Sequence, residues 1–353
     1  MDIFPKVYII ILNYNGWADT IECLESVLRN DYTNYQVIVI DNNSTNDSME
    51  YIKNWAEGKL DVLVKPDHPL RRLSFPPVKK PIPYVYYIRE EAEKGGNIRL
   101  ENKLIGKIPE GITTKYPLVF IQTGKNLGFS GGNNVGIRYA IAKDDFDYIW
   151  LINNDTVINP STLKDMVHIT FNKNFKFLLS NKINFYNDPE KIWFLMPIFY
   201  PFIGIVIDKF FMKNTKNVKV IPSIIETNFL TGCSLLIPKY SFKDIGLLDE
   251  KIFLYNEDLD YSIRCLKKGY KLMIVPNIFI FHKVGMSRNL SCKNYFWGEY
   301  SIGYVYRKHR NFIGKYRLTT LLFQTFIKLP IRFIKNKKCL LSMYKGAVLG
   351  WIK

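Results

Sequence analysis

The chain has 353 residues, 47% of them hydrophobic, and a formal net charge of +17. This length and apolar content exclude an unfolded chain and allow a sizeable core, in one large domain or in a domain with an appendage. Its five cysteines are odd in number and lack C-x-x-C spacing, so they indicate neither a disulfide framework nor a zinc site and fit a reducing cytosolic setting. The six-residue apolar run near the N-terminus is too short for a secretory signal or a membrane span.

The first sixty residues alternate strand and helix patterns. Residues 7–12 form a buried-strand pattern that ends in the polar tetrapeptide NYNG, and residues 36–40 form another that ends in DNNS. Each is followed by a helical pattern with one apolar face. Such alternation predicts βαβ units and a mostly parallel sheet, whose polar strand ends gather along one edge.

Residues 66–117 interrupt this rhythm with six prolines between 66 and 83 and with charges of both signs. We expect an elaborated surface loop or a small subdomain here, inserted before the next strand at 118–122. A second irregular segment, 192–207, is strongly apolar but contains Pro197 and Pro201, which argue against a regular transmembrane helix. Core packing is favoured for it over an apolar lip that meets a lipid-like acceptor.

A glycine-rich run, residues 125–136, follows the strand at 118–122 and opens a helix. Small residues at a helix N-terminus let backbone N–H groups approach an anion, here a donor phosphate or ribose. Gly131 and Gly136 have P-loop spacing, but Ile137 and Arg138 replace the required Lys and Ser/Thr, and the run contains no G-x-G-x-x-G. These absences weigh against an ATPase and a nicotinamide dehydrogenase. The alternative, tight packing of the helix on a strand, explains one or two of the glycines.

Residues 146–156 form an apolar strand that ends in Asn153, Asn154 and Asp155. Open α/β sheets bind ligands at the carboxyl ends of such strands, so we expect Asp155 at the lip of an active site. The oxygen ligands there suit magnesium or manganese bridging a diphosphate better than zinc. The alternative is a polar turn, which Asn and Asp also favour.

A second carboxylate cluster begins a helix near residue 257. Asp258 and Asp260 are two residues apart and cannot share a helix face, so at most one of them, with Glu257, can face the site. Acidic residues also suit the first turn of any helix because of its dipole. Two strands are expected next, at 271–275 and 278–281, and the second ends in His282.

Residues 300–353 contain no Asp or Glu and carry +12 of the net charge of +17. Large aliphatic residues and Pro330 lie between the basic ones, a pattern typical of segments that lie in a membrane interface. The alternatives are a basic helix pair packed on the core and a nucleic-acid contact. The membrane is favoured because the interleaved residues are mainly aliphatic.

Taken together, the motifs of residues 7 to about 290 resemble those of family 2 glycosyltransferases, in the inverting, metal-dependent GT-A type and its rhamnosyltransferase-like branch. In order and spacing, the matching motifs are residues 11–16 (ILNYNG), 39–44 (VIDNNS), 126–134 (NLGFSGGNN), 151–156 (LINNDT), 231–232 (TG), 256–258 (NED) and His282.

The resemblance implies a role for each matched position. Tyr14 stacks on the donor base and Asp41 hydrogen-bonds it. Asp155 and His282 bind the metal, and Asp258 is the catalytic base. The remaining donor-binding residues would be Asn126, Gly131, Gly132, Asn133, Asn153 and Asn154. Asn153 and Asp155 occupy the ends of the family's D-x-D motif, so Asn153 departs from its acidic form and leaves one fewer charge on the metal.

We therefore expect an α/β protein of GT-A type, with a mostly parallel central sheet, flanking helices and a helical basic C-terminal tail. Residues 1–299 would form the glycosyltransferase domain, with the insertion 66–117, and residues 300–353 the membrane-associated tail.

The expected reaction, dependent on Mn²⁺ or Mg²⁺, moves a sugar from a UDP- or dTDP-sugar to a glycan or a lipid-linked acceptor in cell-surface polysaccharide assembly. The protein would be cytoplasmic, attached peripherally to the anionic inner face of the cell membrane, and would bind no nucleic acid. A sugar nucleotidyltransferase would need a glycine-rich basic loop after the first strand. Here that loop is NYNG, which contains no basic residue. A non-catalytic carbohydrate-binding module would have lost Asp155 or Asp258, and both are present.

Overall fold

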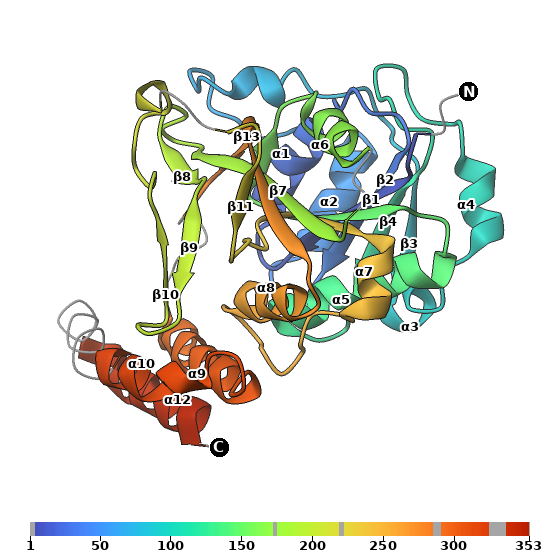
Figure 1. Cartoon of the computed structure of the whole chain (residues 1–353). Coiled ribbons are helices and arrows are strands. Elements are labelled where there is room, and N and C mark those ends of the chain that lie inside the picture. Colours follow the sequence, from blue (N-terminus) through green and yellow to red (C-terminus); the bar gives the residue numbers. More distant parts are fainter. Residues whose placement is uncertain (1–3, 172–174, 219–221, 285–290, 325–336, 353) are drawn as a thin grey trace.

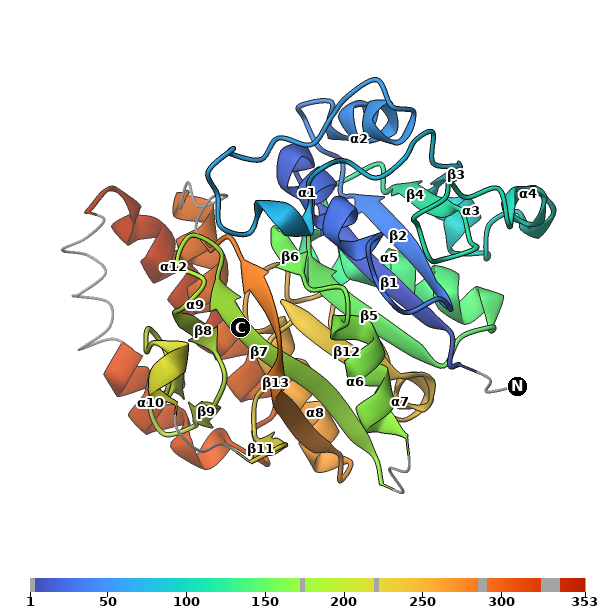
Figure 2. The same ribbon diagram turned by 90° about the horizontal axis from the view of Figure 1, so that it is seen from above.

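A computed structural model describes residues 4–171, 175–218, 222–284, 291–324 and 337–352 (Figure 1). The described residues build a mixed sheet of eleven strands, nine of which follow the order β11-β13-β7-β12-β5-β1-β2-β4-β3 (Figure 2). The strands are β1 (Val7–Asn13), β2 (Tyr35–Asp41), β3 (Tyr84–Ile88), β4 (Leu118–Gln122), β5 (Tyr148–Asn153), β6 (Thr156–Ile158), β7 (Phe177–Phe185), β8 (Ile192–Phe194), β11 (Ile225–Thr227), β12 (Ser234–Pro238) and β13 (Lys271–His282).

The strands from β5 to β3 in this order are parallel, which confirms the expected α/β class. The residues of β1, β2, β4 and β5 are almost all buried, because helices cover both faces of the sheet. Pairing aligns Asn13 with Asp41 and Leu12 with Asn153, so the polar ends of β1, β2 and β5 lie along one edge.

Helices cover the two faces of this sheet. Figure 1 shows α6 above the sheet and α5, α7 and α8 below it. The helices before the C-terminal region are α1 (Trp17–Val27), α2 (Ser48–Ala56), α3 (Arg89–Ala92), α4 (Ile98–Leu104), α5 (Gly128–Lys143), α6 (Thr162–Thr170), α7 (Lys239–Asp244) and α8 (Glu257–Lys267).

The insertion 66–117 is more than a surface loop, which corrects the expectation. It contributes β3, which extends the parallel sheet beyond β4 and buries Val85 and Tyr87. It is also tied to α1 through the fully buried Glu25, whose oxygens accept hydrogen bonds from Val78 N and Lys80 Nζ, each at 2.8 Å. The sequence hid this strand because prolines and mixed charges surround it.

Two further elements differ from the prediction. The strands expected at 271–275 and 278–281 form one strand, β13, with an irregularity between Val275 and Phe279. Segment 192–207 is divided between the core and the surface. Its first part, including Ile192, Leu195 and Phe199, is buried in the core, whereas its last residues, Val206 and Ile207, are exposed.

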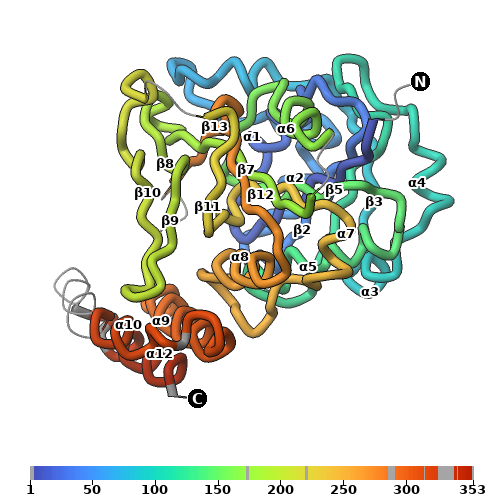
Figure 3. The backbone as a smooth tube through the Cα atoms, in the orientation of Figure 1, coloured from blue at the N-terminus to red at the C-terminus, as the bar shows by residue number. Residues whose placement is uncertain are grey.

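The exposed end of that segment belongs to a two-stranded ribbon, β9 (Pro197–Tyr200) and β10 (Ile205–Asp208). Figure 3 shows the ribbon running away from the sheet toward a group of helices at the C-terminal end. These helices are α9 (Cys292–Lys308), α10 (Arg317–Phe323) and α12 (Leu340–Ile352), and we call them the helical appendage.

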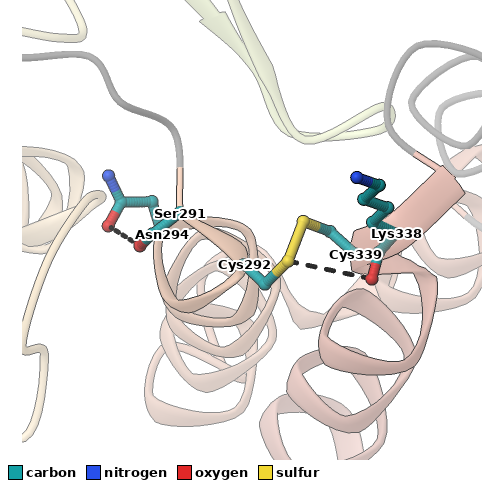
Figure 4. The surroundings of a disulfide bond; sticks show 5 residues. All are labelled: Ser291, Cys292, Asn294, Lys338 and Cys339. Atoms are coloured by element: carbon teal, nitrogen blue, oxygen red, sulfur yellow. Dashed lines mark hydrogen bonds between the residues drawn. A yellow bond between two sulfur atoms is a disulfide. The ribbon is translucent and has the colours of Figure 1, made fainter.

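The appendage contains a disulfide between Cys292 and Cys339, 47 residues apart, which corrects the expectation drawn from cysteine spacing (Figure 4). Cys23, Cys233 and Cys265 are free and buried. The bond joins the start of α9 to the residue before α12, two elements that only the fold brings together. The cysteines therefore no longer support a reducing setting, since disulfides persist mainly in oxidising ones.

Helices α9 and α12 pack closely through glycine. An added Cβ on Gly303 would lie 2.5 Å from the carbonyl carbon of Gly350, and one on Gly350 would lie 2.4 Å from the oxygen of Tyr300. Val305 and Tyr306 of α9 are fully buried, and α9 runs without interruption through residues 299 and 300, where we had placed a domain boundary.

This contact gives a stability prediction with a matched control in the same helix. Gly303→Ala should lower the free energy of unfolding by about 1–3 kcal/mol, because the methyl group meets backbone that cannot rotate away. Gly298→Ala should be neutral or stabilising by up to about 1 kcal/mol, since the nearest atom to its Cβ is 3.7 Å away and alanine favours the helix. Thermal unfolding of both variants measures the difference, and equal melting temperatures would contradict this view of the α9–α12 contact.

The described part of the C-terminal region is helical, as expected. The expected amphipathic residues Phe326, Ile327, Lys328, Leu329, Pro330, Ile331, Arg332, Phe333, Ile334 and Lys335 lie outside the described residues. Within the described ranges, no helix has both the length and the apolar character needed to cross a membrane.

Candidate active site

A cleft of about 1390 Å³ opens at the polar edge of the sheet, bounded on its far side by β13, α8 and the start of α9. It brings together residues from strand ends that are far apart in sequence. The predicted site residues that line it are Tyr14, Asn126, Asn153, Asn154, Asp155, Asp258 and His282.

The loops after β1 and β2 form one wall and are joined by the side chain of Asp41. Asp41 is buried, and its carboxylate accepts hydrogen bonds from Asn13 Nδ2 at 2.7 Å, Ser44 Oγ at 2.5 Å and Gln122 Nε2 at 2.9 Å. Its oxygens are thus engaged within the protein, and its expected hydrogen bond to the donor base stays a prediction. Tyr14, beside it, is 47% exposed and is open to a stacking partner.

The glycine-rich run also differs from the prediction. Gly131 and Gly132 face protein, because an added Cβ would lie 2.8 Å from Leu127 Cβ and 2.5 Å from Leu12 Cδ1, respectively. The Asn133 side chain donates a hydrogen bond to the carbonyl of Phe129 at 3.0 Å. Gly132 packs α5 on β1 through Leu12, as the packing alternative predicts, whereas Gly131 and Asn133 contact the first turn of α5.

Only the start of this run reaches the cleft, through Asn126, Gly128 and Phe129. Asn42, at the end of β2, fixes that segment. Its Nδ2 donates to Asn126 Oδ1 at 3.1 Å and its Oδ1 accepts from Leu127 N at 2.9 Å. Asn42 also lines the cleft, although Asp41 was the residue of this motif that was predicted to bind the donor.

Asp155 and His282 meet at the floor of the cleft. Asp155 follows β5, and His282 ends β13, which pairs with the adjacent β6, so Asp155 Oδ1 lies 3.0 Å from His282 Nε2. Burial alone would raise the pKa of Asp155, but the neighbouring His282 and Lys283 outweigh it and hold that pKa below its ordinary value. Burial opposes the imidazolium form of His282, whereas Cys233 and Asp155 favour it and raise its pKa to about 10.

Glu257 and Asp258 begin α8 on the opposite wall. Asp258 Oδ1 accepts a hydrogen bond from Leu259 N at 2.8 Å, and Oδ2 lies 3.4 Å from Gly232 N. Burial raises the pKa of Asp258 to about 6, and burial together with the charge of Asp258 raises that of Glu257 further. At neutral pH, Asp258 is therefore the carboxylate of the pair that is ready to accept a proton.

Residues 231–233 connect the two walls. Gly232 N points to Asp258, while the carbonyl of the next residue, Cys233, accepts a hydrogen bond from Asn153 N at 3.1 Å. The backbone of residues 231–233 thus connects the end of β5, at Asn153, to the start of α8, at Asp258.

Asp260 faces away from the cleft, as its spacing from Asp258 predicted. Its carboxylate contacts Arg264 Nε at 2.8 Å, Lys308 Nζ at 2.7 Å and His309 Nε2 at 2.8 Å. Burial opposes its charge, but His309 and these cations outweigh burial and lower the pKa of Asp260 to about 2. Asp260 anchors α8 to α9.

The cleft also has an apolar wall, part of which comes from segment 192–207, for which core packing was favoured. Trp193 packs edge-on against His282, with ring centroids 4.6 Å apart, and Phe253 stacks on Trp297 of α9 at 4.8 Å. The apolar residues lining this side are Trp193, Phe194, Pro197, Val206, Ile207, Phe211, Phe229, Val284, Phe296 and Trp297. The available signal was Trp193 in this apolar segment, because tryptophan is rarely buried completely.

The comparisons with known proteins agree with this architecture. A mannosyltransferase from Pyrobaculum calidifontis, solved with GDP-Man and Mn²⁺, superposes with a TM-score of 0.53 at 11% identity, covering 99% of this chain and 88% of its own. GalNAc-T7, solved with UDP, GalNAc and Mn²⁺, superposes with a TM-score of 0.50 at 13% identity, covering 94% of this chain and 58% of its own. The fold is that of the GT-A glycosyltransferases.

Sequence comparison also points to a glycosyltransferase. Residues 8–68 match the family model described as glycosyl transferase family 2.

Curated relatives agree with the rhamnosyltransferase-like branch. The dTDP-rhamnosyl transferase RfbF of Shigella flexneri is 25% identical over 177 residues, 47% of this chain and 52% of that protein. The rhamnosyltransferase WbbL of Escherichia coli K12 is 22% identical over 224 residues, 62% of this chain and 74% of that protein. The low-salt glycan biosynthesis hexosyltransferase Agl10 of Haloferax volcanii is 24% identical over 160 residues, 43% and 48% of the two chains. The chain thus spans about half the length of RfbF and Agl10.

Proposed function

We propose that this protein is an inverting, divalent-cation-dependent glycosyltransferase that moves a sugar from a UDP- or dTDP-sugar to a glycan or lipid-linked acceptor. The observation that carries the proposal is the placement of Asp155, His282 and Asp258 around one cleft whose mouth also holds Tyr14. RfbF is named as a dTDP-rhamnosyl transferase, which supports a dTDP-sugar among the candidate donors.

The possible metal ligands at the cleft floor fit a manganese ion better than a zinc ion. A carboxylate and an imidazole are contributed by Asp155 and His282, and the described residues contain no group of three or more His, Cys, Asp or Glu that could enclose a metal. Ions of this kind commonly complete their shell with substrate phosphates and water. A bound cation would neutralise the charge that grows on the departing diphosphate.

The chain's own residues account for the other steps. Tyr14 stacks on the nucleotide base, while Asn42, Asn126 and Asn154 line the path of the ribose and phosphates. Asp258 takes the proton of the acceptor hydroxyl, whose oxygen attacks the anomeric carbon from the face opposite the diphosphate. The bond to the diphosphate breaks as the new one forms, so the anomeric configuration inverts and the nucleoside diphosphate leaves.

The apolar wall supports a lipid-linked acceptor within this proposal. Val206, Ile207 and Phe211 are exposed and lie in the cleft together with Trp193. Exposed apolar surface of this kind marks a binding site for apolar groups. The protein would then act in cell-surface polysaccharide assembly, at the surface of the cell membrane that carries the acceptor.

The deciding experiment is a donor panel. Purified full-length protein with Mn²⁺ and UDP-, dTDP- or GDP-sugars should release nucleoside diphosphate from one donor class, slowly to water and faster with acceptor. A sugar nucleotidyltransferase would instead form pyrophosphate from a nucleoside triphosphate and a sugar 1-phosphate. Sugar binding with no turnover of any donor would favour the carbohydrate-binding alternative.

A further inference from the structure

Helix α10 buries polar side chains and exposes two of its leucines. Its Thr320 is fully buried and Gln324, at its C-terminal end, is only 2% exposed, whereas Leu318 and Leu322 are 66% and 45% exposed. The two leucines are four residues apart and share one helical face. A surface helix of a globular protein normally turns its apolar face to the core.

The polar face of α10 is held inward by the tip of the β9–β10 ribbon. Thr320 Oγ1 donates a hydrogen bond to the carbonyl of Pro201 at 2.7 Å, and Gln324 Nε2 donates to those of Ile203 and Gly204 at 3.4 Å. Tyr306 of α9 also donates to the Pro201 carbonyl. Phe202, within this anchored tip, is itself 47% exposed.

The ribbon tip and α10 thus form one unit that presents apolar and basic side chains. We call Phe202, Leu318 and Leu322, with the exposed Lys315 and Arg317 beside them, the docking face. No acidic residue occurs between residues 300 and 353. Large apolar side chains flanked by cations of one sign are complementary to an anionic lipid surface, where the rings and leucines enter the acyl boundary and the cations meet phosphate.

We infer that the docking face binds the anionic surface of a lipid bilayer. The same ribbon carries Val206 and Ile207 in the cleft, so this contact would hold the apolar wall of the cleft beside the membrane. The inference rests on the proposed function only for that purpose, the delivery of a lipid-linked acceptor. A second copy of the chain suits the face less well, because two surfaces of the same charge repel. Nucleic acid would leave the leucines without a partner.

The test is co-sedimentation of the intact protein with phosphatidylcholine vesicles that contain or lack phosphatidylglycerol. The protein should bind the anionic vesicles, less at high salt but not negligibly, because screening weakens only the electrostatic part of the attraction. Leu318→Ser/Leu322→Ser should reduce binding at least about tenfold, since two apolar side chains no longer enter the interface. The matched control is Ile98→Ser/Leu100→Ser on α4, whose residues are 59% and 44% exposed, and it should bind like the original protein.

Thermal unfolding must show that both double variants remain folded. If the intact protein ignores anionic vesicles at low salt, or if the α4 variant loses as much binding as the α10 variant, the inference fails. If the protein sediments as a dimer and the α10 double variant as a monomer, the docking face binds a second copy of the chain. If the protein binds an oligonucleotide but not vesicles, the docking face binds nucleic acid. Donor hydrolysis without vesicle binding would overturn this inference alone, whereas vesicle binding without any donor turnover would overturn the proposed function alone.

Discussion

Asp258→Asn should lower kcat by about 100-fold or more while leaving the Kd of the donor within a few-fold. General-base catalysis typically contributes about 10² to 10⁴ in rate, and a base acts in the transition state rather than in ground-state donor binding. Asparagine keeps the shape of the side chain and can retain the contact with Leu259 N, so the fold should persist. Steady-state kinetics and a donor-binding titration of the same preparation separate the two quantities.

Two neighbouring carboxyls provide the controls. Glu257→Gln should cost less in kcat, because burial and the charge of Asp258 keep Glu257 protonated at neutral pH. Asp260→Asn should act mainly on stability, since it removes the partner of Arg264 and Lys308 on the far face of α8. If donor affinity collapsed in the Asp258 variant, this residue would be a ligand or a structural group, and the base would have to be sought at Glu257.

The pH profile supplies an independent readout of the same assignment. A base must be deprotonated to act, and the pKa of Asp258 is raised to about 6 by burial. The kcat/KM of the original enzyme should therefore fall about tenfold per pH unit below that value and level off above it. The residual activity of Asp258→Asn should lack this limb, because asparagine does not titrate.

The strand ends were predictable because periodicity and polarity act locally. An apolar run that stops at a polar tripeptide is visible in the sequence, and the parallel register that aligns Asn13 with Asp41 follows from βαβ geometry. For the same reason the sequence alone predicted that Tyr14 and Asp155 lie at the cleft.

What the sequence could not supply were the consequences of contacts between distant segments. Gln122 and Ser44 engage the oxygens of Asp41, and nothing in the motif around Asp41 specifies those partners. Gly132 was read as a phosphate contact, whereas its missing side chain makes room for Leu12 of β1.

The C-terminal region shows the same limit on a larger scale. Its charge and aliphatic content were visible, but the sequence did not reveal that α9 is part of the core or that Cys292 pairs with Cys339. The outward orientation of Leu318 and Leu322 follows from a contact that the sequence does not show, the hydrogen bond from Thr320 to Pro201 at the tip of the β9–β10 ribbon. Burial of a helix is decided by what packs against it, not by its own periodicity.

Asp155→Ala should bring cation-dependent donor turnover to background. In the proposed site Asp155 would supply the carboxylate beside the imidazole of His282, and a lone imidazole is a poor site for a hard cation. The pKa of Asp155 is held below its ordinary value, so this ligand is ionised across the working pH range. The loss should therefore be seen at every pH at which the original enzyme is active.

A readout apart from turnover is the cation-dependent stabilisation of the fold. Mn²⁺ with a nucleoside diphosphate should raise the melting temperature of the original protein, because both bind only the folded state, and should leave that of Asp155→Ala unchanged. Asn153→Ala is the graded control, since an amide contributes no charge to the metal, and its response should be weakened rather than lost. Full activity of the original enzyme in excess EDTA would show that the leaving-group charge is stabilised without a divalent cation. An undiminished Mn²⁺ response in Asp155→Ala would show that the cation binds without this carboxylate, and either result would overturn the assignment of Asp155.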